Sequence, residues 1–450
     1  MKNNICRAFI AAFLVLCLMP LAALPIVGEA EPAANELPLA RPALWDEDGL
    51  NTDYCAELTD YLASRFAFRQ ELVTVWSALN AGLFSSSAQE ELILGRRGWL
   101  FYSETLEDYM GLGLSDGQLQ NAANDLALIQ EYLETQDIDL VFAVAPNKNS
   151  LYPQYMPGRI RAGRAASNAV RLAGLLRERG VCSADLFSAF EGGEPLYYAS
   201  DSHWNSQGAA LAADVILAAL GRESAYSSAD FSPGAEHQGD LFEMLYPALR
   251  DRERDMDSGL DFSSNCLKDP AEGNAMSIQT ENPQGAGSLL CFRDSFGVAL
   301  YPYLAQSFET ARFSRAAAYD LSGVADEGVD AVVIELVERN LDYLLEKAPC
   351  FPAPLREAEA VAGEGLAQAE RSGEDGAGLV QTLGLLPGSL CDEGSRVYLR
   401  AGDRVYEAWV LTAEDDEGTA FSAWLDKDIT AEEALCMSGG RLTAYKIEWK

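Results

Sequence analysis

The sequence predicts an α/β fold, in which helices flank a mainly parallel sheet, followed by a small C-terminal all-β module. Three short, continuously apolar runs have the length and composition of parallel strands that are buried on both faces. Segments with helical spacing of apolar residues alternate with these runs, as in an open parallel sheet. Beyond residue 379, alternating apolar stretches between Gly and Asp turns predict short strands joined by turns. The three runs cover residues 140–145, 289–292 and 331–334.

The other predicted elements follow in the order that this fold requires. Helical spacing predicts a helix pair or one kinked helix at residues 53–83, and two strands about a basic turn at residues 92–102 come next. The polar stretch at residues 251–288 has no clear period and predicts a loop or short hairpin. Further helices are predicted at residues 116–134, 165–179, 206–220 and 298–308, and further strands at residues 181–186 and 311–313.

The chain of 450 residues is longer than one typical domain, and its composition divides it into four parts. Lys2 and Arg7 precede a long apolar run that ends in small residues, as in a signal peptide or an uncleaved membrane anchor. The four parts are this N-terminal segment at residues 1–30, the α/β domain at 31–355, a linker rich in Ala, Gly and Glu at 356–378, and the β module at 379–450.

The β module contains six aromatic residues that have two interpretations. They could form a platform on which sugar rings stack, or they could be the core of the module. Both interpretations suit aromatic side chains, which have large apolar faces. The residues are Tyr398, Tyr406, Trp409, Trp424, Tyr445 and Trp449.

The charge of the chain excludes one class of partner. It contains 33 Lys and Arg residues against 69 Asp and Glu residues, for a formal net charge of −36. Nucleic-acid binding requires Lys and Arg to neutralise phosphates, so we expect no nucleic-acid partner. The cysteines lack the paired spacing of a zinc site, so we expect no metal.

Two segments that are well separated in the chain contain together the parts of an acyl-transfer triad. A serine hydroxyl needs a neighbouring imidazole to take its proton and a carboxylate to fix the imidazole tautomer. His203 follows Asp201 by two residues, so this carboxylate can reach the ring Nδ1 from within one turn. The segments at residues 201–205 and 292–297 therefore predict Ser295 as nucleophile, His203 as base and Asp201 as its partner.

The expected position of Ser295 suits this chemistry. It follows the second apolar run and precedes a helical pattern, which places it where a strand ends and a helix begins. Open-sheet enzymes keep their ligands at this edge, and backbone N–H groups there can bind an oxyanion. The Ser295 N–H is the first candidate donor. The alternative is that Asp294 or Ser295 simply caps the helix.

Several ordered motifs strengthen the catalytic interpretation because they resemble one family. They stand at residues 35–40, 65–69, 98–102, 146–153, 201–205, 239–241, 293–297 and 337–339. Their order resembles that of the SGNH-type O-acetyltransferases of exported polysaccharides, the alginate O-acetyltransferase group, and most closely the Gram-positive branch called DHHW proteins. The resemblance covers residues 36–345, and it departs from the DHHW pattern at Ser202, where that branch has His.

The resemblance implies an SGNH-like O-acetyltransferase domain at residues 31–355. It implies the same roles for Ser295, His203 and Asp201, with the Asp-x-His element before the nucleophile. It also makes three further residues candidates for oxyanion or substrate binding, although each has a structural alternative. Asn147 and Lys148 could cap a turn, and Arg339 could pair with its neighbour Glu338.

The function implied by the resemblance is that of an extracytoplasmic O-acetyltransferase, either secreted or anchored by the N-terminal segment. It would move an acetyl group through a Ser295 acyl-enzyme to a hydroxyl of an exported or cell-wall polysaccharide. The family receives acetyl groups from a membrane-bound O-acyltransferase partner and uses no diffusible cofactor. Two alternatives stay open: a carbohydrate O-acetyl esterase with the same triad, and a non-catalytic surface protein that binds glycan through its β module.

Overall fold

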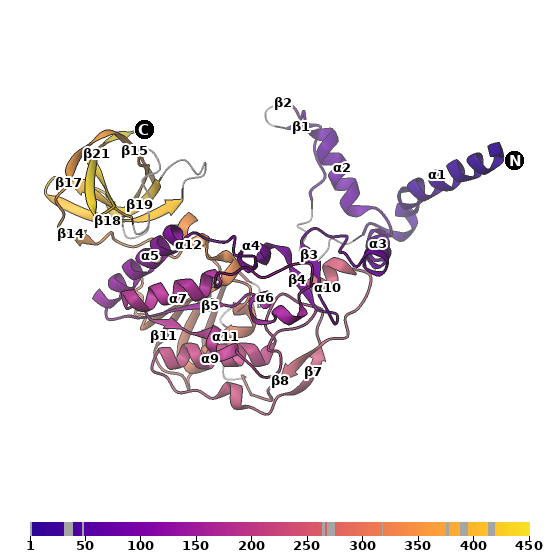
Figure 1. Cartoon of the computed structure of the whole chain (residues 1–450), viewed down its shortest axis with the longest axis horizontal. Helices are drawn as coiled ribbons and strands as arrows, with labels where there is room; N and C mark the ends of the chain where they lie inside the picture. Colours follow the sequence, from indigo (N-terminus) through magenta and orange to yellow (C-terminus); the bar gives the residue numbers. More distant parts are fainter. Residues whose placement is uncertain are drawn as a thin grey trace.

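The computed structural model describes residues 2–30, 39–46, 49–262, 266–267, 275–316, 318–374, 378–387, 395–412 and 419–450. Figure 1 shows a central α/β domain, with the N-terminal helices on one side and the C-terminal β module on the other. Most of the motif at residues 35–40 lies outside the described residues.

The central sheet confirms the predicted α/β class. Its order is β6 (Ser183–Ala184), β5 (Asp139–Ala145), β13 (Ala331–Val337), β11 (Ser288–Phe292), β12 (Thr310–Ser314), β10 (Ser277–Glu281) and β9 (Cys266–Leu267). The strands from β6 to β12 pair in parallel, and β10 and β9 add an antiparallel edge. The three predicted apolar runs are β5, β11 and β13, which lie side by side in the centre. Every residue of β13 is buried, which explains its apolar run at residues 331–334.

Alternate residues of these strands contribute to two separate hydrophobic cores. Val141 and Val333 pack with α8 (Leu186–Phe190), α9 (Ser206–Ala219) and α11 (Gly297–Ser307) on one face. Phe142 and Ile334 pack on the other face with α5 (Asp116–Thr135), α7 (Asn168–Arg179) and α12 (Tyr343–Glu346). The predicted helices α5, α7, α9 and α11 are therefore confirmed as parts of the two layers that cover the sheet, whereas the short helices α8 and α12 were not predicted (Figure 1).

The segment before the central domain is helical. The structure has α1 (Lys2–Val27), α2 (Tyr54–Arg65) and α3 (Arg69–Phe84), so residues 53–83 form the predicted helix pair. The helical conformation is interrupted between α2 and α3 at Phe68, whose φ of 64° lies in the left-handed region. Within the described residues, none of the helices combines the length and apolar character that crossing a bilayer requires.

Short elements connect these layers. The predicted strand pair is present as β3 (Leu92–Leu94) and β4 (Leu100–Tyr102). The others are β1 (Trp45–Asp46), β2 (Gly49–Leu50), α4 (Leu106–Tyr109), α6 (Lys148–Leu151), α10 (Asp240–Leu245) and the 3₁₀ turns η1 (Ser103–Thr105), η2 (Pro153–Tyr155), η3 (Tyr226–Ser228) and η4 (Glu338–Asn340).

The polar stretch at residues 251–288 contains more structure than a loop. β8 (Arg254–Asp257) pairs antiparallel with β7 (Ser232–Glu236), which lies before this stretch and is separated from β8 by a short helix, so this pair is not the expected hairpin. β10 was not predicted, and it joins the central sheet beside β12. Only Ile278 and Thr280 are buried in β10, so this half-polar strand gave little hydrophobic signal.

The prediction of a linker at residues 356–378 is wrong. Val361–Glu374 is the long strand β15, which pairs with β16 (Leu379–Leu385) and β21 (Arg441–Trp449). Ala367 and Ala369 point into the core of the module and are at most 2% exposed. At Gly363, a Cβ atom would come within 2.7 Å of Thr443 and Tyr445 side-chain atoms. The small residues that suggested a linker are those that fit inside a narrow barrel.

The C-terminal module is all-β, as predicted. Its sheet has the order β14, β18, β17, β20, β21, β15, β16 and β19, and additional β18–β19 pairing closes it into a barrel. The remaining bounds are β14 (Leu355–Arg356), β17 (Arg396–Ala401), β18 (Arg404–Thr412), β19 (Thr419–Asp426) and β20 (Glu433–Ser438). Of the six aromatic residues, Tyr398, Tyr406, Trp409 and Tyr445 are buried. The core interpretation therefore holds for the three tyrosines, whereas Trp409 packs against the α/β domain and donates to the Leu344 carbonyl oxygen at 2.9 Å.

Candidate active site

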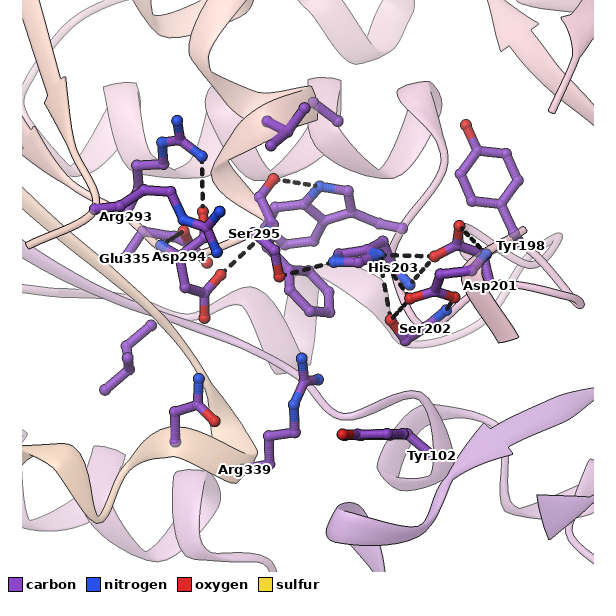
Figure 2. A pocket seen from close by; sticks show the side chains of 18 of the residues that line it. Tyr102, Tyr198, Asp201, Ser202, His203, Arg293, Asp294, Ser295, Glu335 and Arg339 are labelled. Atoms are coloured by element: carbon purple, nitrogen blue, oxygen red, sulfur yellow. Dashed lines mark hydrogen bonds and ion pairs between the residues drawn. The ribbon is translucent and has the colours of Figure 1, made fainter. Parts of the chain in front are cut away.

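A cleft of about 820 Å³ opens at the carboxyl ends of β11 and β13. Its lining includes Asp201, His203, Ser295 and Arg339, which come from three distant parts of the chain. Figure 2 shows Asp201, His203 and Ser295 in a row along one wall, while Arg339 and Tyr102 face them from the other. The structure thus places the two predicted segments at the sheet edge where open α/β proteins bind ligands.

The predicted triad residues are within hydrogen-bond distance of one another. His203 Nε2 lies 2.8 Å from Ser295 Oγ, and His203 Nδ1 lies 2.7 Å from Asp201 Oδ1. The same Asp201 oxygen accepts from the His203 backbone N–H at 2.9 Å. This carboxylate therefore fixes both the main chain and the ring of His203, which directs Nε2 at the serine hydroxyl.

The tryptophan next to His203 joins the two segments. Trp204 is 1% exposed, and its Nε1 donates to the Phe296 carbonyl oxygen at 3.2 Å. The two rings meet edge to face with centroids 5.0 Å apart. Asn205 then caps α9 by accepting from the Gly208 N–H at 3.0 Å. Packing on one side and a helix cap on the other hold His203 between them.

The turn that carries Ser295 is fixed by the carboxylate before it. Asp294 Oδ1 accepts from the Phe296 N–H at 2.8 Å, and Oδ2 accepts from the Val337 N–H at 2.7 Å. The second bond ties the turn to the end of β13. Gly297 is required here because a Cβ atom would lie 2.5 Å from the Arg293 side chain.

Ser295 does not act as a helix cap. α11 has Phe296 as its N-cap residue and no side-chain cap hydrogen bond. Ser295 Oγ bonds to His203 instead, and the Ser295 backbone N–H makes no hydrogen bond within the described residues. An unpaired N–H beside a hydroxyl that contacts an imidazole is the arrangement needed to bind an oxyanion.

The charges around His203 favour its protonated form. Burial lowers the pKa of His203, but the hydrogen bond and charge of Asp201 outweigh it and hold the pKa above its usual value. For Asp201, burial acts to raise the pKa, while its bonds to two histidines bring it well below the usual range. Asp201 is therefore ionised at neutral pH and stabilises an imidazolium at His203.

A second carboxylate lies close to the same imidazole. Asp240 Oδ2 is 3.6 Å from His203 Nδ1, and the carboxylate accepts from the Ser202 N–H at 2.8 Å and from its Oγ at 2.5 Å. Burial and the charge of Asp201 raise the pKa of Asp240. Ligand atoms of Asp201, His203 and Asp240 lie within 4.8 Å of one another, but a cation there would displace the Asp201–His203 hydrogen bond. We therefore assign Asp201, His203 and Asp240 to a hydrogen-bond network and not to a metal site.

His237 also contacts Asp201, and this contact was not predicted. Its Nε2 lies 2.8 Å from Asp201 Oδ2, and its ring stacks on Tyr198 with centroids 3.8 Å apart. His237 is the second of the two histidines in the chain. The rarity of histidine is the sequence signal that could have identified His237, because the second member of so rare a residue type could be expected at the same site as the first.

Asn147 and Lys148 were predicted as oxyanion donors or substrate ligands, and the structure places them elsewhere. Neither lines the cleft. Lys148 Nζ donates to the carbonyl oxygens of Leu100, Ala199 and Asp201, each at 2.7 Å, which uses the full capacity of an ammonium group. Burial lowers the pKa of Lys148 to about 7. Its role is to hold the main chain at Asp201.

Asn147 is buried and does not line the cleft, whereas Arg339 does. Asn147 is 1% exposed, and its N–H donates to Glu338 Oε2 at 2.8 Å. Glu338 therefore bonds to Asn147 and to Ser150, not to Arg339. The Arg339 guanidinium lies 5.5 Å from the Tyr102 ring centroid and 5.7 Å from that of Phe296, and it makes no ion pair with any described residue. Of the three candidates, only Arg339 faces the cleft.

The comparisons with known proteins agree with the motifs. A family model described as the SGNH hydrolase-like domain of acetyltransferase AlgX matches residues 92–253. The predicted resemblance is confirmed. The matched range contains Asp201, His203 and His237, whereas Ser295 lies beyond it. The placement of Ser295 opposite His203 therefore rests on the geometry alone.

Individual relatives are distant. An AlgJ protein of Pseudomonas syringae pv. tomato, named as a probable alginate O-acetylase, is 26% identical over 181 residues, which cover 39% of this chain and 44% of the relative. The match thus spans less than half of that protein. PatB1 of Bacillus cereus is 19% identical, with a TM-score of 0.44 over 56% of this chain and 96% of that one. A DHHW family protein of Eubacterium siraeum is also 19% identical, with a TM-score of 0.38 over 51% and 86%.

Proposed function

We propose that this protein is an extracytoplasmic O-acetyltransferase that acts on a polysaccharide through a Ser295 acyl-enzyme. The observation that carries the proposal is the 2.8 Å contact between Ser295 Oγ and His203 Nε2 inside the cleft, with Asp201 on the other ring nitrogen. A serine activated in this way is suited to acyl transfer. The match to an acetyltransferase domain supports acetyl as the acyl group.

In the first step, Ser295 Oγ attacks the carbonyl carbon of an acetyl donor while His203 Nε2 takes the hydroxyl proton. The oxyanion of the tetrahedral intermediate accepts a hydrogen bond from the free Ser295 N–H. Asp201 stabilises the imidazolium that forms. His203 then returns its proton to the departing donor group, which leaves acetyl-Ser295.

In the second step, a sugar hydroxyl attacks the acetyl-Ser295 carbonyl. His203 takes the hydroxyl proton and then gives it to Ser295 Oγ as the ester bond to the enzyme breaks. The product is an acetylated sugar and the starting enzyme, with no net change in protons or electrons. Neither step needs a metal ion or a cofactor.

The resemblance and the size of the cleft support a polysaccharide as acceptor and a membrane protein as acetyl donor. The relative from Pseudomonas syringae pv. tomato is named a probable alginate O-acetylase, which supports a polysaccharide acceptor. A cleft of about 820 Å³ is of the size that takes a ligand of a few sugar rings. Arg339 adds a positive charge there in an otherwise acidic protein. The apolar N-terminal run supports export, and we propose a membrane-bound O-acyltransferase as acetyl donor.

The test compares transfer with hydrolysis in purified protein. A chromogenic acetyl ester is supplied with and without oligosaccharide, and new acetyl groups on the sugar are detected by mass spectrometry. Ser295→Ala should lower acetyl transfer by at least ~10³-fold. Ser288→Ala, at the other end of β11, is the matched control and should keep wild-type transfer.

Each other outcome of this experiment would support one of the two alternative functions. Acetate release with unchanged oligosaccharide would make the protein an esterase. Full activity of Ser295→Ala would remove the catalytic proposal and leave a glycan-binding surface protein as the remaining interpretation.

A further inference from the structure

The carboxylate of Asp201 is shared by the only two histidines in the chain. Oδ1 bonds to His203 Nδ1 at 2.7 Å, and Oδ2 bonds to His237 Nε2 at 2.8 Å. Asp201 is 5% exposed, so water contributes little to satisfying it. Oδ2 also accepts from the Asp240 N–H at 3.1 Å. The orientation of the Asp201 carboxylate therefore depends on His237 as well as on His203.

The ring of His237 is held in place independently of Asp201. It lies flat on Tyr198, with centroids 3.8 Å apart and an angle of 7° between the planes. Its backbone N–H donates to the Glu253 carbonyl oxygen at 2.9 Å, and its side chain is 28% exposed. With its ring stacked on Tyr198 and its main chain bonded to Glu253, His237 presents Nε2 to Asp201 before any substrate binds.

We propose that His237 is a positioning residue that orients Asp201. By gaining or losing a proton, His237 also sets how strongly the imidazole of His203 binds its proton. The inference rests on the proposed function, in which His203 is the base. His237 Nδ1 makes no hydrogen bond with any described residue. Because Nε2 must carry a hydrogen to donate to Asp201, the proton that titrates sits on Nδ1. The Asp201 contact thus persists in both charge states.

The groups around His237 keep it close to its charged form. Burial lowers the pKa of His237, but the hydrogen bond and charge of Asp201, together with Asp255 and Glu253, outweigh it and raise the pKa. Tyr198, the stacked ring, stays neutral because burial raises its pKa far above neutrality. Asp240 and Arg339 act on His203 from the other side, raising and lowering its pKa respectively.

The sign of the coupling follows from these charges. When His237 is protonated, its positive charge offsets that of Asp201, so His203 holds its proton less tightly and becomes available as a base at lower pH. When His237 is neutral, Asp201 acts on His203 alone and the pKa of His203 rises. A His237 variant that keeps a donor to Asp201 but cannot be charged should therefore raise the pKa of His203.

The direct test is an NMR titration of the full chain with labelled histidine. Only two imidazole signals are expected, and they can be assigned by His237→Gln, which keeps a neutral N–H donor. We expect the His203 pKa to rise by about 0.5 to 1 unit in this variant. An unchanged His203 pKa would overturn the coupling. This measurement needs no acetyl transfer, so it stands or falls separately from the proposed function.

Kinetics separate positioning from two other roles. His237→Phe keeps the stack on Tyr198 and removes the donor, so it should lower kcat about tenfold, as loss of a single orienting bond does. His237→Gln should retain most of kcat and move the acid limb of the pH profile upward. Equal losses in both variants with an unmoved pH profile would reduce His237 to a structural role. A raised KM with an unmoved profile would instead make it an acceptor contact; either result overturns the proposal.

Discussion

Trp204 and Phe296 connect two segments that lie far apart in the chain, through an indole N–H that donates to a backbone carbonyl oxygen at 3.2 Å. Each residue is a direct neighbour of a triad member, His203 on one side and Ser295 on the other. The contact is fully buried, and the edge-to-face rings add to it. It is therefore the contact that sets the distance between the imidazole and the hydroxyl.

Trp204→Phe should weaken this connection without emptying the core. The variant loses one buried hydrogen bond, which we expect to lower the free energy of unfolding by about 1–2 kcal/mol. Loss of alignment between His203 and Ser295 should lower kcat/KM for ester cleavage by up to about 100-fold. Denaturant unfolding and steady-state kinetics measure the two effects. Trp76→Phe is the control, because Trp76 is 61% exposed on α3 and should change neither quantity. Wild-type activity in Trp204→Phe would show that the two segments align without this bond.

The pH dependence of acyl transfer should report the raised pKa of His203. The imidazole must be neutral to accept the Ser295 proton, so activity is lost as the pH falls through its pKa. Because Asp201 holds that pKa above the ordinary value, the acid limb of kcat/KM should have its midpoint above ~6.5. Asp201→Asn removes the charge, so it should lower the midpoint and reduce kcat by about 10⁴-fold. A midpoint that does not move in Asp201→Asn would contradict the assigned partner.

Lys148 should matter for stability and not for substrate binding. Lys148→Met fills the space but leaves the buried carbonyl oxygens of Leu100 and Asp201 without this donor, each at a cost of about 1–3 kcal/mol, whereas the Ala199 oxygen keeps its bond from the Leu100 N–H. We therefore expect a large loss of unfolding free energy in a denaturant titration. The matched control is Lys347→Met, since Lys347 is exposed and makes no ion pair with the residues that the structure describes. A stable Lys148→Met protein with raised KM would favour the substrate-binding role that the sequence suggested.

The β15 strand can be tested by adding volume to it. Ala367 is fully buried in the barrel, whereas its neighbour Gln368 is exposed. Ala367→Leu should lower the free energy of unfolding by about 1–3 kcal/mol through overpacking. Gln368→Leu, on the outer face, should be close to neutral. If residues 356–378 were a linker, both changes would leave the melting temperature unchanged.

The fold was largely predictable because its central strands carry a signal that is local. β5, β11 and β13 contain continuous apolar runs at residues 140–145, 289–292 and 331–334, since both faces of each strand are covered by helices. β10 and β15 escaped prediction for different reasons: β10 is half polar because only one of its faces is buried, and β15 is rich in the small residues that a barrel interior needs. In both cases the neighbouring strands, and not the segment itself, decide the structure.

The sequence by itself determined which residue types could form a triad and that Asp201 stands within reach of His203, because two residues of spacing fix a short distance. The tertiary structure decided the rest. It brought His203 to Ser295, set His237 on the far oxygen of Asp201, and withdrew Lys148 from the cleft into a buried site. Contacts between distant segments depend on how layers pack across a sheet edge, and no pattern within either segment specifies that arrangement.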